Sequence, residues 1–306
     1  MGPKRRIIDF LAGRAMLATT LFSGMLVVVI AASLYARSRP LIASKSLSAI
    51  IFGANWKPSN GEFGLGPFII GTAWVTAVAA IIAVPLCILA SIYLAEYAAL
   101  RTRSILKPLV DLLAGIPSVV YGAWAALVIV PLIADHLGPY AQTHLRHIPL
   151  LNAEYVTGYS VLAGGIVLAV MICPVIISVA EEVLRAVPQD YRDASYAVGA
   201  TRLETITKVV MRRATRGLVA AVVLGVSRAL GETMAVLMVV GNVAALPKSV
   251  FDPAYPLPAL IANNYGEMMS IPLYDSALLC ASLVLLVIVL LFNVAARLVL
   301  ARGVSR

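Results

Sequence analysis

The sequence predicts an all-α polytopic membrane protein with six transmembrane helices and both termini on the cytoplasmic side (N-in/C-in). Composition is the first observation behind this prediction. The 306 residues are 61% hydrophobic and 13% charged, with a mean hydropathy of +0.93. A water-soluble domain of this size carries far more charge. The chain is therefore built for a lipid environment.

Long runs without charged residues are the second observation. Five runs lack Asp, Glu, Lys and Arg over a length sufficient to cross a bilayer. A sixth run is equally apolar but contains Arg228 and Glu232. The predicted spans are approximately residues 15–36, 68–95, 112–134, 158–180, 217–242 and 276–296, within one membrane domain covering 1–306. The first run is longer than the apolar core of a signal peptide, so we expect it to be an uncleaved span.

The distribution of basic residues is the third observation. The formal charge of +9 raises the question of nucleic-acid binding. However, 17 of the 24 Lys and Arg residues fall in segments that six spans would place on one side. Cytoplasmic segments of membrane proteins are enriched in Lys and Arg. The charge therefore predicts orientation, with no nucleic-acid partner.

The span at 217–242 is the most informative for function. On a continuous helix, Arg228 and Glu232 would share one face with Ala221, Gly225 and Ala235. Because a charged residue deep in a bilayer is costly, this face should point toward protein, water or a passing ion. Two interpretations remain open. The pair could line a route for an ion, or it could simply neutralise itself inside the bundle.

Prolines inside the predicted spans mark possible breaks. Pro85 and Pro174 each lie well inside an apolar run, and Pro117 lies in a cluster with Gly115 and Ser118. Each proline frees a backbone carbonyl, which a bilayer tolerates where a neighbour or a water-lined cavity satisfies it. Broken helices often line transport routes, although ordinary kinks are at least as common. We predict Gly115, Pro117 and Ser118 as pathway residues.

The remaining candidate features predict neither catalysis nor metal binding. The three cysteines lie in apolar runs without CxxC spacing, which is typical of packed hydrophobic residues. The three histidines share one polar loop, where only His144 and His147 could share a helical face as metal ligands. The outer segment 37–67 predicts an ordered loop with Trp56 and Phe63 as aromatic anchors at the bilayer interface.

The inner segment 181–216 predicts two short helices that meet at a turn. Pro188 suits a first helical turn, and Gly199 is placed to end that helix in the left-handed region. Thr201 and Glu204 then have the spacing of a capping box, which predicts a second helix. Its basic residues could bind anionic headgroups. The helical shape indicates a projection that receives force from a partner.

Several motifs resemble a known family. Asp193-Ala194-Ser195 followed by Gly199 is similar to the cytoplasmic loop signature of ABC importer permeases, although that signature begins Glu-Ala-Ala and closes with Leu-Pro. The runs at 56–72, 113–122 (LAGIPSVVYG) and 228–236 (RALGETMAV) resemble the PstC-type permease of the phosphate-specific ABC importer. The resemblance implies the type I importer permease fold in the bacterial inner membrane. It also implies docking of an ATPase on Asp193, Ala194, Ser195, Gly199, Ala200 and Thr201.

The resemblance also implies partners and a mechanism. The partners would be a PstA-like permease, two ATPase subunits, an external phosphate-binding protein and inorganic phosphate, all in membrane lipid. The chain has no phosphate loop of the GxxxxGK[ST] type, so we expect no cofactor on it, with ATP and Mg²⁺ used by the ATPase. Arg228 would bind phosphate and Glu232 would moderate that binding. The chain would be a transport subunit and not an enzyme.

Three alternatives remain open at this point. The substrate could be another oxyanion such as sulfate or molybdate. The chain could be a secondary transporter in which Glu232 relays protons. A membrane scaffold or sensor that only reports phosphate is the third.

Overall fold

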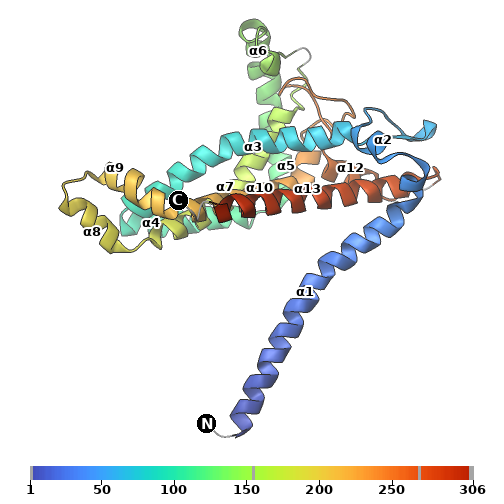
Figure 1. Cartoon of the computed structure of the whole chain (residues 1–306). Coiled ribbons are helices and arrows are strands. Elements are labelled where there is room, and N and C mark those ends of the chain that lie inside the picture. Colours follow the sequence, from blue (N-terminus) through green and yellow to red (C-terminus); the bar gives the residue numbers. More distant parts are fainter. Residues whose placement is uncertain (1–2, 154–155, 268–269, 303–306) are drawn as a thin grey trace.

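The computed structural model describes residues 3–153, 156–267 and 270–302, which are mostly helical (Figure 1). The helices are α1 (Pro3–Ser44), α2 (Leu47–Phe52), α3 (Gly66–Ile92), α4 (Leu100–Ala114), α5 (Ser118–Leu132), α6 (Gly138–His144), α7 (Val161–Arg185), α8 (Gln189–Ala197), α9 (Arg202–Glu204), α10 (Met211–Leu230), α11 (Met234–Leu237), α12 (Leu257–Asn264) and α13 (Tyr274–Arg302). Three segments are π-helical: η2 (Tyr93–Tyr97) extends α3, η3 (Ile133–Leu137) extends α5, and η5 (Thr205–Val210) precedes α10. Two short 3-10 turns are η1 (Pro58–Asn60) and η4 (Pro149–Leu151). The strands β1 (Trp56–Lys57) and β2 (Glu62–Phe63) form a small antiparallel hairpin.

The bundle is formed by α3, α7, α10 and α13, which run alongside one another (Figure 1). The short helices α8 and α9 lie at one end of the bundle, and α2 and α12 lie at the other. α1 joins the bundle at the α2 end and then leads away from it, whereas α5 and α6 lead away on a different side. We call the α8 end inner and the α2 end outer, following the predicted orientation.

The contact between α3 and α7 forms the centre of the bundle. Gly165 of α7 lies so close to α3 that a Cβ atom there would be 2.3 Å from a methyl of Val78. Gly164 on the same turn faces Val75. Small residues permit such close approach between membrane helices, where van der Waals packing holds the helices together. These glycines therefore set the spacing of the central pair.

Aromatic residues form the core of the outer end. Trp56 of the hairpin makes edge-on contacts with Phe63 and Phe68, at centroid distances of 5.7 and 5.1 Å, and Phe68 contacts Tyr255 at 5.4 Å. Phe63 is only 3% exposed. The prediction that Phe63 anchors the chain at the bilayer interface is therefore wrong, because its ring is enclosed by protein. The predicted loop 37–67 also begins later, since α1 continues to Ser44.

Five helical stretches are long and apolar enough to cross a membrane, judged over the described part of the chain: Asp9–Ser44, Gly66–Tyr97, Ser118–His144, Val161–Arg185 and Tyr274–Val299. Each overlaps a predicted span. The third begins at Ser118 and not near residue 112, because the chain breaks at Pro117. The prediction of a continuous helix over 217–242 is wrong, because α10 ends at Leu230 and only the short α11 follows. The count of six spans and the N-in/C-in orientation stay predictions.

Of the three prolines singled out, only Pro117 interrupts a helix. Pro85 lies inside the continuous α3, and Pro174 lies inside the continuous α7. Both helices are packed against each other along the bundle, where neighbouring groups can compensate for one lost hydrogen bond. Among the segments with these three prolines, the hypothesis of a broken helix therefore applies only to Gly115–Ser118.

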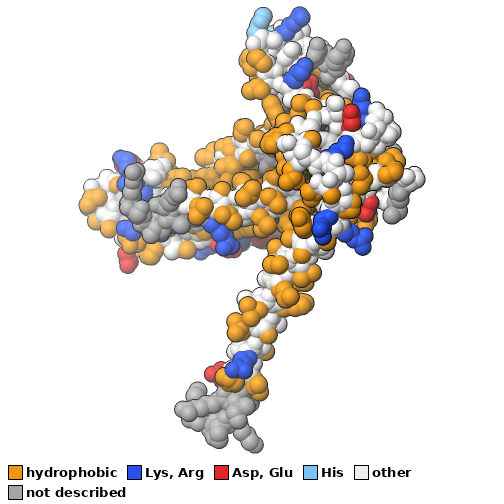
Figure 2. All heavy atoms as spheres, turned by 45° about the vertical axis from the view of Figure 1, so that its right-hand side comes forward, with side chains coloured by type: hydrophobic (Ala, Val, Ile, Leu, Met, Phe, Trp, Pro, Cys, Tyr) orange, Lys and Arg blue, Asp and Glu red, His pale blue; other side chains and the backbone are white. Residues whose placement is uncertain are grey.

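Hydrophobic side chains cover most of the outer surface of the bundle and of α1 (Figure 2). On α1, Leu21 is 65% exposed and Phe22 is 64% exposed. A surface this apolar is stable against lipid or against another apolar helix, and not in water. The Lys and Arg side chains in Figure 2 gather mainly toward the ends of the molecule.

Candidate functional site

The first predicted pathway segment is a break between two helices. α4 ends at Ala114, and α5 begins at Ser118 after Gly115 and Pro117. A hydrogen bond spans the break: the Tyr121 hydroxyl of α5 donates to the Leu113 carbonyl of α4 at 2.8 Å. That carbonyl belongs to the last turn of α4 and also accepts a 3.3 Å hydrogen bond from the N–H of Ile116, just after the helix. Tyr121 thus fixes the angle between α4 and α5.

The second predicted pathway segment is also a break. α10 ends at Leu230, and the backbone N–H groups of Gly231 and Glu232 bond to the carbonyls three residues earlier, as in a tight final turn. Glycine has a low helix propensity, which favours a stop at Gly231. The Glu232 carboxylate then accepts a 3.1 Å hydrogen bond from the N–H of Thr233, just before α11. A negative charge is favourable at the start of a helix.

Arg228 lies in the last turn of α10 and is exposed. Counting from Arg216 at 1.5 Å per residue, it lies roughly 18 Å along the helix. Its guanidinium makes no hydrogen bond and no ion pair within 4.0 Å in the part of the chain that the structure describes. The expected Arg228–Glu232 contact is therefore absent there, because the continuous helix that would have created it is broken.

The two breaks lie close together. α11 packs on α5, where a Cβ atom on Gly122 would be 2.7 Å from the Met238 sulfur and 3.0 Å from the Ala235 Cα. Tyr121 is the residue before Gly122 in α5, and Arg228 lies in the last turn of α10, just before the break that leads to α11. Two segments over a hundred residues apart in sequence thus place an arginine, a tyrosine and two helix ends in one region.

The inner segment folds as its sequence predicts, with one difference in extent. Gly199 has φ +82° and ends the helical turn after α8, and Thr201 with Glu204 forms a complete capping box. The hydrogen bond from the Thr201 N–H and the ion pair with Lys208 lower the pKa of Glu204 to about 2. The predicted loop 181–216 is shorter than expected, because α7 continues to Arg185 and the helix from Arg202 runs through η5 into α10.

The predicted ATPase-docking residues lie on the exposed side of this segment. Asp193, Ala194, Gly199 and Thr201 are exposed, and Ala200 is half-buried. The Ser195 hydroxyl points inward instead and lies 2.9 Å from that of Thr205 in η5. Val198 at the tip is 84% exposed. The segment therefore exposes most of the predicted docking residues, whereas Ser195 contacts η5 and holds α8 against it.

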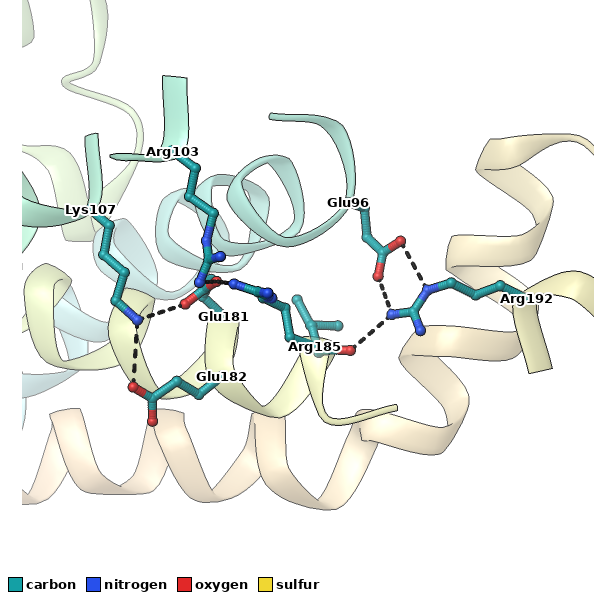
Figure 3. Close-up of polar contacts among 8 residues, drawn as sticks. Glu96, Arg103, Lys107, Glu181, Glu182, Arg185 and Arg192 are labelled. Carbon is teal, nitrogen blue, oxygen red and sulfur yellow. Dashed lines mark hydrogen bonds and ion pairs between the residues drawn. The ribbon is translucent and has the colours of Figure 1, made fainter. Parts of the chain in front are cut away.

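Arg192 holds α8 against the inner end of α3, a contact that the sequence did not reveal (Figure 3). Its guanidinium donates to both carboxylate oxygens of Glu96, at 2.6 and 3.3 Å, and to the carbonyls of Val187 and Leu184. The side chains of Arg192 and Glu96 are only 10% and 7% exposed. Arg202 adds a bond to the Glu96 carbonyl and stacks over Tyr97.

A second set of charged contacts joins α4 to α7 (Figure 3). Arg103 and Lys107 lie 2.7 and 3.0 Å from the carboxylate oxygens of Glu181, which is 1% exposed. One turn further along α4, Asp111 accepts a 2.8 Å hydrogen bond from Ser178. These residues recur every four positions on α4 and thus share one face. No spacing rule could have paired them, because their partners are about 70 residues away.

A match to a family model agrees with this architecture. Residues 87–303 match the model described as "Binding-protein-dependent transport system inner membrane component". Among solved structures, the chain is similar to the MetNI methionine ABC transporter in inward-facing conformations. In one crystal form the TM-score is 0.55 at 20% identity, with 77% of this chain and 94% of that chain covered. This likeness supports the fold of an ABC importer permease.

Relatives of higher identity extend over most of the chain. A phosphate transport system permease protein PstC from Mesorhizobium japonicum is 36% identical over 93% of this chain and 89% of its own length. A probable PstC from Methanocaldococcus jannaschii is 35% identical over 80% and 77%. The probable ABC transporter permease YqgH from Bacillus subtilis is 41% identical over 78% and 72%. This chain belongs to the family of inner membrane components of binding-protein-dependent transport systems, as a multi-pass permease subunit with a transport role.

Proposed function

We propose that the chain is the permease subunit of a phosphate importer driven by ATP, and that it forms one half of the route across the membrane. The observation that carries this proposal is the resemblance to PstC permeases at 35 and 36% identity over most of both chains. The residues at 113–122 and 228–236, which belong to that resemblance, include the two helix breaks that lie close together. Sequence likeness and geometry thus support the same region as the route.

Arg228 is the proposed phosphate-binding residue of this route. Its side chain is exposed and its charge is free of any acidic partner within the described residues. A guanidinium matches the oxygens of phosphate with planar donors. A cation near the middle of the membrane is costly when it faces lipid, which favours a position facing a second subunit and the substrate. Gly115, Pro117 and Ser118 would form the adjacent wall.

Glu232 is proposed to act on Arg228 through space and not through a direct ion pair. Its carboxylate accepts the Thr233 N–H and helps to begin α11. We propose that it fixes the position of the break next to Arg228 and lowers the local positive potential through space. A transport site has to release its ion as well as bind it, and a nearby negative charge favours release.

The partners are part of the proposal. A PstA-like permease would cover the exposed face around Arg228, two ATPase subunits would bind the segment around Asp193–Thr201, and an external phosphate-binding protein would deliver the ion at the outer end. The chain itself would bind no cofactor, with ATP and Mg²⁺ used by the ATPase subunits. The exposed Val198 at the tip and the apolar surface of the bundle support this division of contacts.

Uptake by the whole complex tests this function. The two permeases and the ATPase are reconstituted in vesicles with ATP on the ATPase side and the binding protein on the other. We expect accumulation of labelled phosphate that persists after the proton gradient is dissipated and that excess sulfate or molybdate does not reduce. Loss of uptake with the gradient would indicate a secondary transporter. Competition by sulfate or molybdate would indicate a different oxyanion, and a complex that moves no ion would contradict the proposal.

A further inference from the structure

We propose that the ion pair between Arg192 and Glu96 is the joint through which α8 moves α3, and that α3 carries this motion to the outer end of the permease. The inference rests on the proposed function, because it assumes that an ATPase moves α8. It assigns a positioning role to two residues outside the proposed docking surface and outside the proposed phosphate route.

The Arg192–Glu96 ion pair adds a connection to α8 beyond those that the chain itself provides. α8 is already continuous in the chain with α7 through residues 186–188 and with α9 through residues 198–201. Arg192 adds a connection to α3, 96 residues earlier in the sequence. All three guanidinium nitrogens donate a hydrogen bond, and both carboxylate oxygens of Glu96 accept one. Such bidentate pairs fix distance and orientation together.

Burial separates this pair from an ordinary surface ion pair. The exposed pair between Glu204 and Lys208 has side chains that are 44% and 71% exposed and can separate into water at little cost. The side chains of Arg192 and Glu96 are 10% and 7% exposed. Breaking a buried pair leaves charges without partners, which is strongly unfavourable. Glu96 is therefore expected to follow Arg192 when α8 is displaced.

α3 is suited to transmit the displacement along its length. Its inner end carries Glu96 in η2, and it packs along α7 through the close contact of Val78 with Gly165. At its outer end, the Thr72 hydroxyl accepts a 2.9 Å hydrogen bond from the Leu257 N–H, and Phe68 lies in the aromatic core. The α3 helix thus connects α8 to the first residue of α12. Coupling of this kind travels through packed elements that move as units.

The first test replaces Glu96 by glutamine in the reconstituted complex, and measures phosphate taken up and ATP hydrolysed in the same vesicles. Glu96→Gln keeps the shape but removes the charge that Arg192 holds. We expect ATP hydrolysis to continue while the amount of phosphate moved per ATP falls about fivefold or more, the range of couplings between distant sites. A purely structural role would lower both activities together.

Glu182→Gln is the matched control. Glu182 is also a glutamate at the inner end of a membrane helix, and its 3.5 Å ion pair with Lys107 is lost in the variant. Its side chain is 69% exposed, and it holds α4 and not α8. We expect the phosphate-to-ATP ratio of this variant to equal that of the unchanged complex. A ratio in Glu96→Gln that also stays unchanged would overturn the proposal.

A second variant replaces the charges by a covalent link. Cys87, Cys173 and Cys280 are first changed to alanine, and Glu96→Cys with Arg192→Cys is then introduced in that background. An open cavity of about 700 Å³ lined by both residues gives a short bifunctional thiol reagent access. We expect the amount of phosphate moved per ATP to be low before the two cysteines are cross-linked and to rise after cross-linking. No rise after complete cross-linking would contradict the role as a joint.

The two proposals fail in different ways. If the unchanged complex moves sulfate and not phosphate, the proposed substrate is wrong, but the ratio measured with sulfate still tests the joint. If the unchanged complex moves phosphate and Glu96→Gln keeps the same ratio, only the joint is wrong. If the cysteine-free background loses transport, the comparison of Glu96→Gln with Glu182→Gln decides alone.

Discussion

Basic residues at the inner end and the basic residue in the proposed route are treated differently by the fold. At the inner end, Arg103, Lys107 and Arg192 each lie within 3.0 Å of a carboxylate oxygen that belongs to this chain. Arg228 is exposed and has no such partner within the described residues. The difference indicates two uses of positive charge. Arg103, Lys107 and Arg192, whose anions belong to this chain, hold helices together, whereas Arg228 is available for an anion from outside.

The largest expected effect is on transport. Arg228→Gln should lower phosphate uptake by the reconstituted complex by about a hundredfold, because a charge-assisted contact with the ion is lost. It should leave the heat resistance of the complex unchanged, because no contact within the described chain depends on the guanidinium. Uptake and the half-time of heat inactivation are measured on the same preparation. Normal uptake in this variant would remove Arg228 from the proposed route.

The opposite pattern is expected for Glu181→Gln. Removing this buried carboxylate leaves Arg103, Lys107 and Arg185 close together without their shared partner. Breaking such a pair costs about 3–5 kcal/mol when both partners are buried, and about 2 kcal/mol is expected here because the cations are partly exposed. The half-time of heat inactivation should shorten, while the initial uptake rate per folded complex stays near normal. A selective loss of uptake would mean that α4 has a direct role in transport.

Glu232→Gln should change phosphate transport less than Arg228→Gln does. The amide oxygen can still accept the Thr233 N–H, so the break should persist, and only the negative charge near Arg228 is lost. We expect tighter phosphate binding and slower release, with a reduction of the uptake rate of about twofold to fivefold, smaller than for Arg228→Gln. Single-turnover release of labelled phosphate measures this. A loss as large as that of Arg228→Gln would indicate that the two residues act as one pair.

The smallest effect concerns the exposed pair that supports the start of α9. The bond from the Thr201 N–H and the contact with Lys208 lower the pKa of Glu204 from 4.5 to about 2. The folded-state pKa is thus below the unfolded value, so the stabilisation is fully present above about pH 4.5 and is lost as the pH falls toward about 2. Protection of the Glu204 amide against hydrogen exchange, corrected for its intrinsic pH dependence, should stay constant from neutral pH to about 4.5 and then decline.

The sequence predicts the apolar helices well because hydrophobic length is a local property. The positions of four spans, the left-handed turn at Gly199 and the capping box at Thr201 and Glu204 follow from residues close together in the chain. The break at Gly231 was missed because the apolar run continues through it, and one glycine is compatible with a continuous membrane helix. The direct ion pair of Arg228 with Glu232, one of the two interpretations of that span, is absent from the described residues for the same reason.

Contacts between distant segments could not be predicted from the sequence. Glu96 and Arg192 are separated by 96 residues, and each alone is consistent with a charge at the edge of a bilayer. Glu181 marks the end of an apolar run, which a sequence pattern interprets as the start of a loop, although it is the most enclosed charged residue of the α4–α7 contact. Such roles depend on which helices pack together. Composition and periodicity do not determine that packing.

Two π-helical segments near the Arg192–Glu96 pair have a further consequence. η2 extends the inner end of α3 and contains Glu96, whereas η5 lies between α9 and α10, and each π turn contains one residue more than an α-helical turn would use. If such a turn tightened to α-helical geometry, the chain beyond it would rotate by about 100° and shift by about 1.5 Å along the axis. A change of this kind at η2 or η5 would rotate one part of the helix relative to the other without a hinge and without loss of helical structure.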